Sequence, residues 1–196
     1  MRQSSAGGVG ALLSGAAFAA LAALTAWSLA TDADPGGLAA LWLTLIPLAT
    51  SGGAVAVHGA LRATGGFGTA TARFALGSAV LAVVSSITAW GWLGYGTWLA
   101  VAMVLLARHL RERGLGIAGR PSRWDWGMPA AWLMGPASQI LSMMTGSVGA
   151  GDSVPWGYVI GLTLGNLVAA ATMVVLARWL RSGIVSPAGA VAGVPA

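Results

Sequence analysis

Side chains capable of acid–base, nucleophilic or metal chemistry are scarce in this sequence. It has 2 histidines and 5 acidic residues, no cysteine, and 10 basic residues that are all arginine. Without cysteine, disulfides, thiol redox chemistry and cysteine metal sites are excluded. Without lysine, a Schiff base on a lysine amine is excluded as well. Any chemistry must therefore use carboxylates, imidazoles or hydroxyls.

The two histidines, His58 and His109, each lie within about one helical turn of an arginine at the end of an apolar run. Two imidazoles at similar depth can hold a haem iron or a metal ion. With no third ligand in sight, the pattern favours contacts with the membrane surface, and we predict neither a cofactor nor a metal site. A catalytic serine needs a neighbouring base. Ser51 precedes His58 by seven residues, about 10 Å along a helix, so no catalytic residue is predicted.

The five carboxylates all lie between apolar runs and none lies inside one. Proton-coupled carriers usually keep a carboxylate within the membrane, so that mechanism is disfavoured. No phosphate-binding GxxxxGK[ST] loop is present. Asp125 lies between Trp124 and Trp126. An enzyme that acts on lipophilic substrates can hold a catalytic acid against aromatic side chains in this way. An anchor at the membrane surface is the simpler interpretation of this cluster.

Two apolar runs are interrupted near their middle. Pro47 is followed closely by Thr50 and Ser51, and Pro136 interrupts a later run. Proline removes an intrahelical hydrogen bond and leaves carbonyls that need partners. Interrupted helices at corresponding positions of two halves are a sequence indication of a transport site at the membrane midplane. Kinks that serve only packing are the alternative.

Three further side chains complete the predicted site. Gln139 and Asn166 fall near the membrane centre, where they either hydrogen-bond each other or line a polar cavity. Trp132 is the one tryptophan predicted well inside a span, whereas the others, Trp179 among them, fit belts at the two membrane surfaces. The predicted substrate-binding residues are Pro47, Thr50, Ser51, Trp132, Pro136, Gln139 and Asn166.

Composition indicates what surrounds these residues. The chain of 196 residues is 57% hydrophobic and 8% charged, whereas a soluble domain carries about a quarter charged residues. Its surroundings must therefore be lipid. A net charge of +5 can indicate nucleic acid, but the arginines lie at the ends of apolar runs, so no nucleic-acid partner is predicted.

The fold class predicted is all-α, a polytopic membrane domain over residues 1–181 followed by a disordered tail, 182–196. A tight turn at Gly94 and Gly96 is expected to separate the third and fourth spans. The first span can alternatively be read as a cleaved signal peptide. The six predicted spans are Val9–Ala30, Leu38–Leu61, Phe74–Trp92, Thr97–Leu110, Met128–Val148 and Trp156–Leu180.

Charge predicts the orientation of these spans. The N-terminal segment, the second and fourth gaps and the segment after the last span contain arginine, while the other gaps hold only aspartate or no charge. This positive-inside pattern predicts that both termini are cytoplasmic, with a basic cytoplasmic loop at 108–126. Three spans in each half would give a 3+3 arrangement with opposite orientations.

Function and partners follow from this architecture as hypotheses. The first is a small permease, or a membrane subunit of a transporter, that moves a small or lipophilic solute across the cell membrane; the basic loop can dock a cytoplasmic partner. The second is a membrane enzyme acting on a lipid or isoprenoid, and the third is a non-catalytic scaffold. Gly157, Gly161 and Gly165 form a small-residue stripe that serves either internal packing or a homo-oligomer.

Overall fold

The computed structural model describes residues 3–31, 39–88, 91–144 and 156–182, and all regular structure in these ranges is helical. The all-α prediction is therefore confirmed, while most of the predicted tail lies outside the described residues. A single-turn 3-10 helix, η2 (Arg123–Trp126), precedes the fifth long helix. The long helices are α1 (Gln3–Thr31), α2 (Ala39–Ala63), α3 (Ala70–Ile87), α4 (Gly91–Arg111), α5 (Gly127–Met144) and α6 (Trp156–Arg181).

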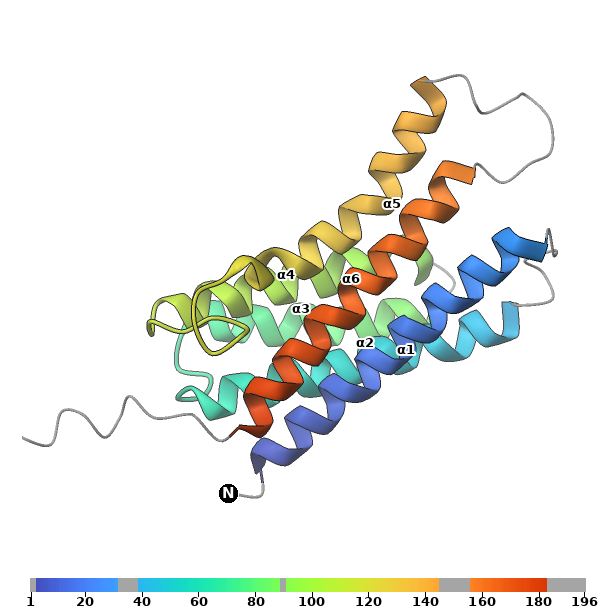
Figure 1. Cartoon of the computed structure of the whole chain (residues 1–196). Coiled ribbons are helices and arrows are strands. Elements are labelled where there is room, and N and C mark those ends of the chain that lie inside the picture. Colours follow the sequence, from blue (N-terminus) through green and yellow to red (C-terminus); the bar gives the residue numbers. More distant parts are fainter. Residues whose placement is uncertain (1–2, 32–38, 89–90, 145–155, 183–196) are drawn as a thin grey trace, which may run out of the picture.

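Consecutive helices run antiparallel, and the last helix, α6, packs along the first, α1 (Figure 1). Helix α2 is central, with contacts to α1, α3, α4 and α6, whereas α5 packs mainly on α6 and only lightly on α4. Figure 1 also shows that α5 is bent partway along its length. The two helices that contain the interrupting prolines therefore occupy different kinds of position, one inside the bundle and one at its edge.

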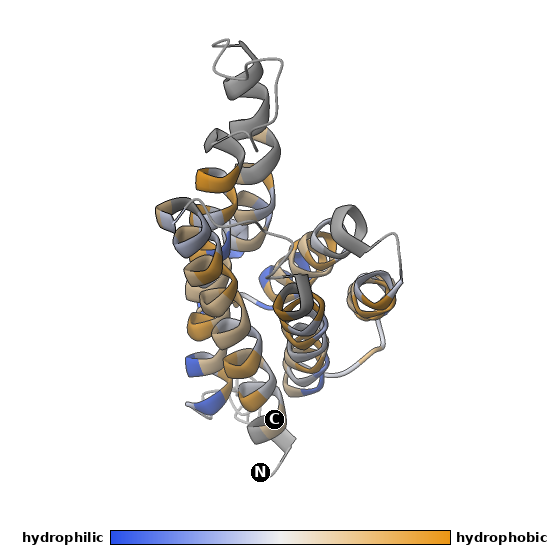
Figure 2. Cartoon of the chain, turned by 90° about the vertical axis from the view of Figure 1, so that its right-hand side faces the viewer, coloured by the Kyte–Doolittle hydropathy of each residue, from blue (hydrophilic) through white to orange (hydrophobic). Residues whose placement is uncertain are grey.

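Four helical segments are long and apolar enough to cross a membrane: Ala6–Ser28, Leu43–Ala63, Ala70–Ile87 and Val159–Arg181. Large apolar side chains also cover the outside of the bundle. Leu43, Phe74 and Ile87 are 73%, 68% and 72% exposed, respectively, and Figure 2 shows apolar residues along the helices. An outer surface of this kind is suited to lipid. The chain therefore has the features of a membrane protein. Among the described residues these four segments are the candidate spans, and none of them lies in α4 or α5.

The predicted turn at Gly94 and Gly96 is wrong. Helix α3 ends at Ile87, and α4 already begins at Gly91, so both glycines lie within α4. Gly96 is needed for packing instead, because a Cβ there would lie 2.9 Å from Cδ1 of Trp132 on α5. The two glycines were interpreted as a turn, but at least one of them makes room for an aromatic ring.

Small residues bring α1 and α2 into backbone contact. A Cβ on Gly59 would lie 2.6 Å from the Cα of Gly7, and one on Gly52 would lie 2.6 Å from the carbonyl oxygen of Gly10. Because the apolar effect does not drive helices together in lipid, close van der Waals contact of this kind must hold them. We call these four residues the α1–α2 glycine seam.

The small-residue stripe of α6 is also used inside the chain. A Cβ on Gly165 would lie 2.5 Å from the carbonyl oxygen of Ala131 on α5, and Gly161 is buried. At Gly165 the internal-packing interpretation therefore holds, since α5 occupies the space a second copy would need. Nearby, the hydroxyl of Thr163 donates to that of Thr25 on α1 at 2.8 Å.

A leucine at position 52 tests the glycine seam. We expect Gly52→Leu to lower stability by about 1–3 kcal/mol, the usual cost of overpacking, because two backbones must separate. Gly77→Leu on α3 is the matched control, since Gly77 is exposed and a Cβ there meets nothing within 4 Å. Thermal unfolding of both variants in the same detergent measures the difference. Equal midpoints would contradict the seam.

Candidate functional site

The hydroxyls beside Pro47 are engaged in helix packing. Thr50 is fully buried, and its hydroxyl lies 3.1 Å from each of two carbonyls in the preceding turn and 3.0 Å from the hydroxyl of Ser86 on α3. On the other side of α2, Ser14 donates to the carbonyl of Ala49 at 2.7 Å. The proline segment is therefore tied to both neighbouring helices.

The remaining residues of the predicted site are dispersed. Ser51 on α2 and Asn166 on α6 are half-buried. Pro136 and Gln139 belong to α5, but their side chains lie outside the described part of the chain, so a Gln139–Asn166 hydrogen bond stays a prediction. Substrate binding by the seven residues also stays a prediction, since Trp132 is the only one of them that lines a described cavity.

Trp132 lies at an apolar groove between α4 and α5. The cavity has a volume of about 290 Å³ and opens to the surface of the bundle. The indole is 38% exposed and lies over Gly96, which lets the two helices approach. We call this cavity the α4–α5 groove; its lining residues carry no charge and are Thr97, Ala100, Val101, Val104, Leu105, Pro129, Trp132 and Leu133.

The loop after α4, at the arginine-rich end of the bundle, is folded around one carboxylate. Asp125 is 2% exposed and accepts a charged hydrogen bond from Nε of Arg111 at 3.0 Å. Its oxygens also accept backbone N–H bonds from Ile117 at 2.9 Å and Ser122 at 3.3 Å. The carboxylate that looked most suited to catalysis is thus saturated by structural contacts.

His109 joins the same loop to α3. The ring is fully buried, and its Nδ1 lies 3.1 Å from the hydroxyl of Thr69 and 3.1 Å from a guanidinium nitrogen of Arg113. A guanidinium only donates, so Nδ1 accepts and the proton is on Nε2, which has no partner among the described residues. The expectation that His109 contacts the membrane surface is wrong, because the ring is fully buried beside Thr69 and Arg113.

His58 does not join His109 in a ligand set. It is half-buried, and its ring stacks at a tilt on Phe67, with 5.3 Å between centroids. Within the described residues no group of three or more potential metal ligands is found.

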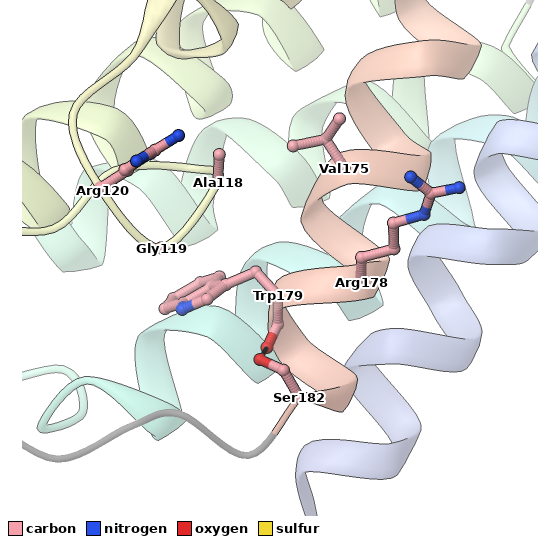
Figure 3. Close-up of a pocket in the computed structure, with 7 residues that line it drawn as sticks. All are labelled: Ala118, Gly119, Arg120, Val175, Arg178, Trp179 and Ser182. Atoms are coloured by element: carbon pink, nitrogen blue, oxygen red, sulfur yellow. Dashed lines mark hydrogen bonds between the residues drawn. The ribbon is translucent and has the colours of Figure 1, made fainter.

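Trp179 departs from the predicted belt of surface tryptophans. It is 5% exposed and lies under the loop, where a Cβ on Gly119 would come within 2.7 Å of its ring. Trp126, by contrast, is 56% exposed, as a belt residue should be. Loop and helix border an open cavity of about 430 Å³, which we call the loop cavity (Figure 3), lined by Ala118, Gly119, Arg120, Val175, Arg178, Trp179 and Ser182.

This folded loop was not predicted from the sequence, although a signal was present. Gly114, Gly116 and Gly119 fall within six residues of an otherwise arginine-rich segment. Gly114 and Gly119 have φ angles of +70° and +80°, which side chains rarely tolerate. A Cβ on Gly116 would collide with the carbonyl of Arg120. Glycines at such spacing indicate a compact turn rather than a flexible linker.

No family model matches the chain, and comparison with curated proteins and with solved structures found no significant match, so the functional argument rests on this geometry alone.

The role of Asp125 is testable by removing its charge. Asp125→Asn should destabilise the protein by about 1–3 kcal/mol, because a buried acceptor loses a charge-assisted bond, and trypsin should cut the loop faster. Glu112→Gln is the control, since Glu112 forms an exposed pair with Arg108 worth at most about 1 kcal/mol. Thermal unfolding and the cleavage rate distinguish the two variants. Equal effects would show that Asp125 does not organise the loop.

Proposed function

We propose that this chain is a multi-pass protein of the cell membrane, with six spans and both termini cytoplasmic, that acts as a permease or transporter subunit for a lipophilic solute. The α4–α5 groove receives the apolar part of the solute. The single observation that carries the proposal is this groove: an uncharged cavity, open at the surface of an apolar bundle, lined partly by Trp132.

The distribution of charge supports the orientation. The nine arginines of the described helices and loop lie at or near the end where α2, α4 and α6 finish (Figure 1), and they outnumber the two carboxylates there, Glu112 and Asp125. Arginine is enriched on the cytoplasmic side of membrane proteins. Helices α4 and α5 are not among the four candidate spans found in the described residues, but they pack on α3 and α6, which are apolar enough to span a membrane.

The packing of the groove supports solute binding. Among consecutive helices, α4 and α5 make the lightest contact, so the groove can open without dismantling the bundle. Its volume of about 290 Å³ is at the lower end of the range for small-molecule sites, about 300–1,000 Å³. That volume suits one ring or a segment of a hydrocarbon chain. Pro136 follows Trp132 by about one helical turn of α5.

Catalysis has less support from the described residues. Asp125 is saturated by hydrogen bonds, and the His109 ring is fully buried. Neither residue lines the groove. Asp32 and Asp34 lie outside the described residues.

An accessory role is the second candidate. The observation that favours it is the folded loop, which holds Trp126 at the surface with Arg111 stacked 5.8 Å from its ring centroid. An ordered surface suits docking of a cytoplasmic subunit better than a flexible loop, because less conformational entropy is lost on binding.

Filling the groove tests the proposed function. Val101 lines the groove and is 37% exposed, so Val101→Trp should occupy its space. Val84→Trp on α3 is the matched control, because Val84 is 50% exposed on the outside of the bundle and is not a lining residue of the groove. The probe is a photoactivatable fatty acid in phosphatidylcholine vesicles, with covalent labelling mapped by mass spectrometry.

We expect wild type and Val84→Trp to be labelled on α4 and α5, and Val101→Trp to lose about 90% of that labelling. Transfer of the fatty acid across the vesicle membrane should fall in parallel. Equal labelling of all three proteins would refute the groove. Labelling without any transfer by wild type would refute transport and leave the accessory role.

A further inference from the structure

The face of α4 that lines the α4–α5 groove continues beyond it to an arginine. Val101 and Val104 line the groove three residues apart, a spacing that places both on one helix face. Arg108 extends this face, four residues after Val104 and about 6 Å further along the helix axis. Arg108 is exposed, whereas its chain neighbours Ala107 and His109 are buried. Toward the arginine-rich end of the bundle, the apolar stripe of the groove therefore ends in a guanidinium group.

The two walls of the groove stay adjacent at this level. On the α5 side, Pro129 lines the groove, and Trp126 at the end of η2 precedes it by three residues, about one helical turn. Trp126 contacts α4 through Arg111, whose guanidinium carbon lies 5.8 Å from the centroid of the indole ring. Arg111 follows Arg108 by three residues on α4. A chain lying in the groove can therefore reach the arginines without leaving the surface that the two helices share.

Arg108 is the more available of these two arginines. Arg111 donates from Nε to the buried carboxylate of Asp125 at 3.0 Å. Arg108 pairs with Glu112 at 3.5 Å, and the side chains of this pair are 72% and 44% exposed, respectively. Exposed pairs of this kind contribute little to stability, so a carboxylate from a ligand can replace Glu112 at small cost. The planar N–H fork of a guanidinium matches the two oxygens of a carboxylate.

The end of α4 would ordinarily oppose an anion, because its last carbonyls carry partial negative charge. The loop reduces that effect. The carbonyl of Leu110 accepts a backbone N–H bond from Leu115 at 2.9 Å, and the carbonyl of Arg111 accepts one from Gly114 at 2.9 Å. Carbonyls satisfied in this way repel an anion less, so the attraction of the Arg108 guanidinium is largely preserved.

We propose that the solute of the α4–α5 groove is a single-chain amphiphile with a carboxylate head, a fatty acid by class, whose chain lies in the groove and whose carboxylate pairs with Arg108. This inference rests on the proposed function and adds the chemical class of the solute. The groove volume of about 290 Å³ admits a segment of one chain. One guanidinium balances the single charge of a carboxylate, whereas a phosphate monoester carries about 1.5–2 charges. In the proposed orientation the head stays at the membrane surface, where arginine is enriched.

The test compares three photoactivatable probes that share one hydrocarbon chain: a fatty acid, the corresponding fatty alcohol and the corresponding alkyl phosphate. Each probe is added at increasing concentration to the full chain in phosphatidylcholine vesicles. Labelling of α4 and α5, mapped by mass spectrometry, gives a half-saturating concentration for each probe. The alcohol reports on the groove alone, because it keeps the chain and carries no charge.

The key variant is Arg108→Gln, and Arg108→Lys restores the charge. The matched control is Arg120→Gln, which removes one charge from an exposed arginine that borders the loop cavity and is not a lining residue of the groove. Glu112→Gln removes the carboxylate that competes for Arg108. It should therefore act in the direction opposite to Arg108→Gln, an effect that a loss of folding cannot imitate.

We expect Arg108→Gln to raise the half-saturating concentration of the fatty acid about fivefold, which is the upper range for loss of an exposed ion pair. Glu112→Gln should lower that concentration, while Arg108→Lys and Arg120→Gln should stay close to wild type. The alcohol should label all of these proteins equally.

Equal responses of the acid and the alcohol to Arg108→Gln would overturn the pairing and leave the solute groove in place. Tighter, Arg108-dependent binding of the alkyl phosphate would overturn the carboxylate class. If none of the probes labels α4 and α5, the proposed function fails together with this inference. If Arg108→Gln also loses labelling by the alcohol, its groove is damaged and Glu112→Gln decides: an unchanged concentration for the acid would overturn the pairing.

Discussion

The architecture depends on how closely α1 and α2 approach. In lipid, apolar side chains gain little by leaving one apolar medium for another, so helices associate through van der Waals contact and hydrogen bonds. The glycine seam provides the first at Gly7, Gly10, Gly52 and Gly59. The hydroxyls of Ser14 and Thr50 provide the second, on opposite sides of α2. The segment around Pro47 therefore contributes to the packing at the centre of the bundle, whatever else it does.

Much of this was predictable from the sequence, because helices in a membrane follow from length and hydropathy. Six long helices are present where six spans were predicted, and four of them contain segments long and apolar enough to cross a membrane. The described arginines cluster at one end of the bundle, while the orientation predicted from the gaps stays a prediction. The turn between α3 and α4 was misplaced because a glycine can mark either a turn or a close contact between two helices. The sequence does not reveal the ring of Trp132 that lies against Gly96. Only the packing of α4 on α5 distinguishes the two roles.

The side chains at the arginine-rich end were less predictable, for a related reason. Trp179 lies against Gly119 of the folded loop, and that fold depends on Asp125 meeting Arg111 and two backbone N–H groups. Periodicity carries no information about such contacts. Trp132 was identified because a tryptophan away from the membrane surface needs a packing partner or a ligand, an argument that uses depth alone.

The hydroxyl contacts between helices have a property that bears on biogenesis. Thr25 and Thr163 join α1 to α6, and the hydroxyl of each also lies within hydrogen-bond distance of carbonyls of its own helix, at 2.9–3.0 Å for Thr25 and 2.9 Å for Thr163, to which its one proton can turn instead. Each helix thus satisfies its own polar side chain before a neighbour is present. Each of these two helices can therefore enter the lipid alone without the free-energy cost of an unpaired hydroxyl. The bundle can then assemble when α6 has been inserted.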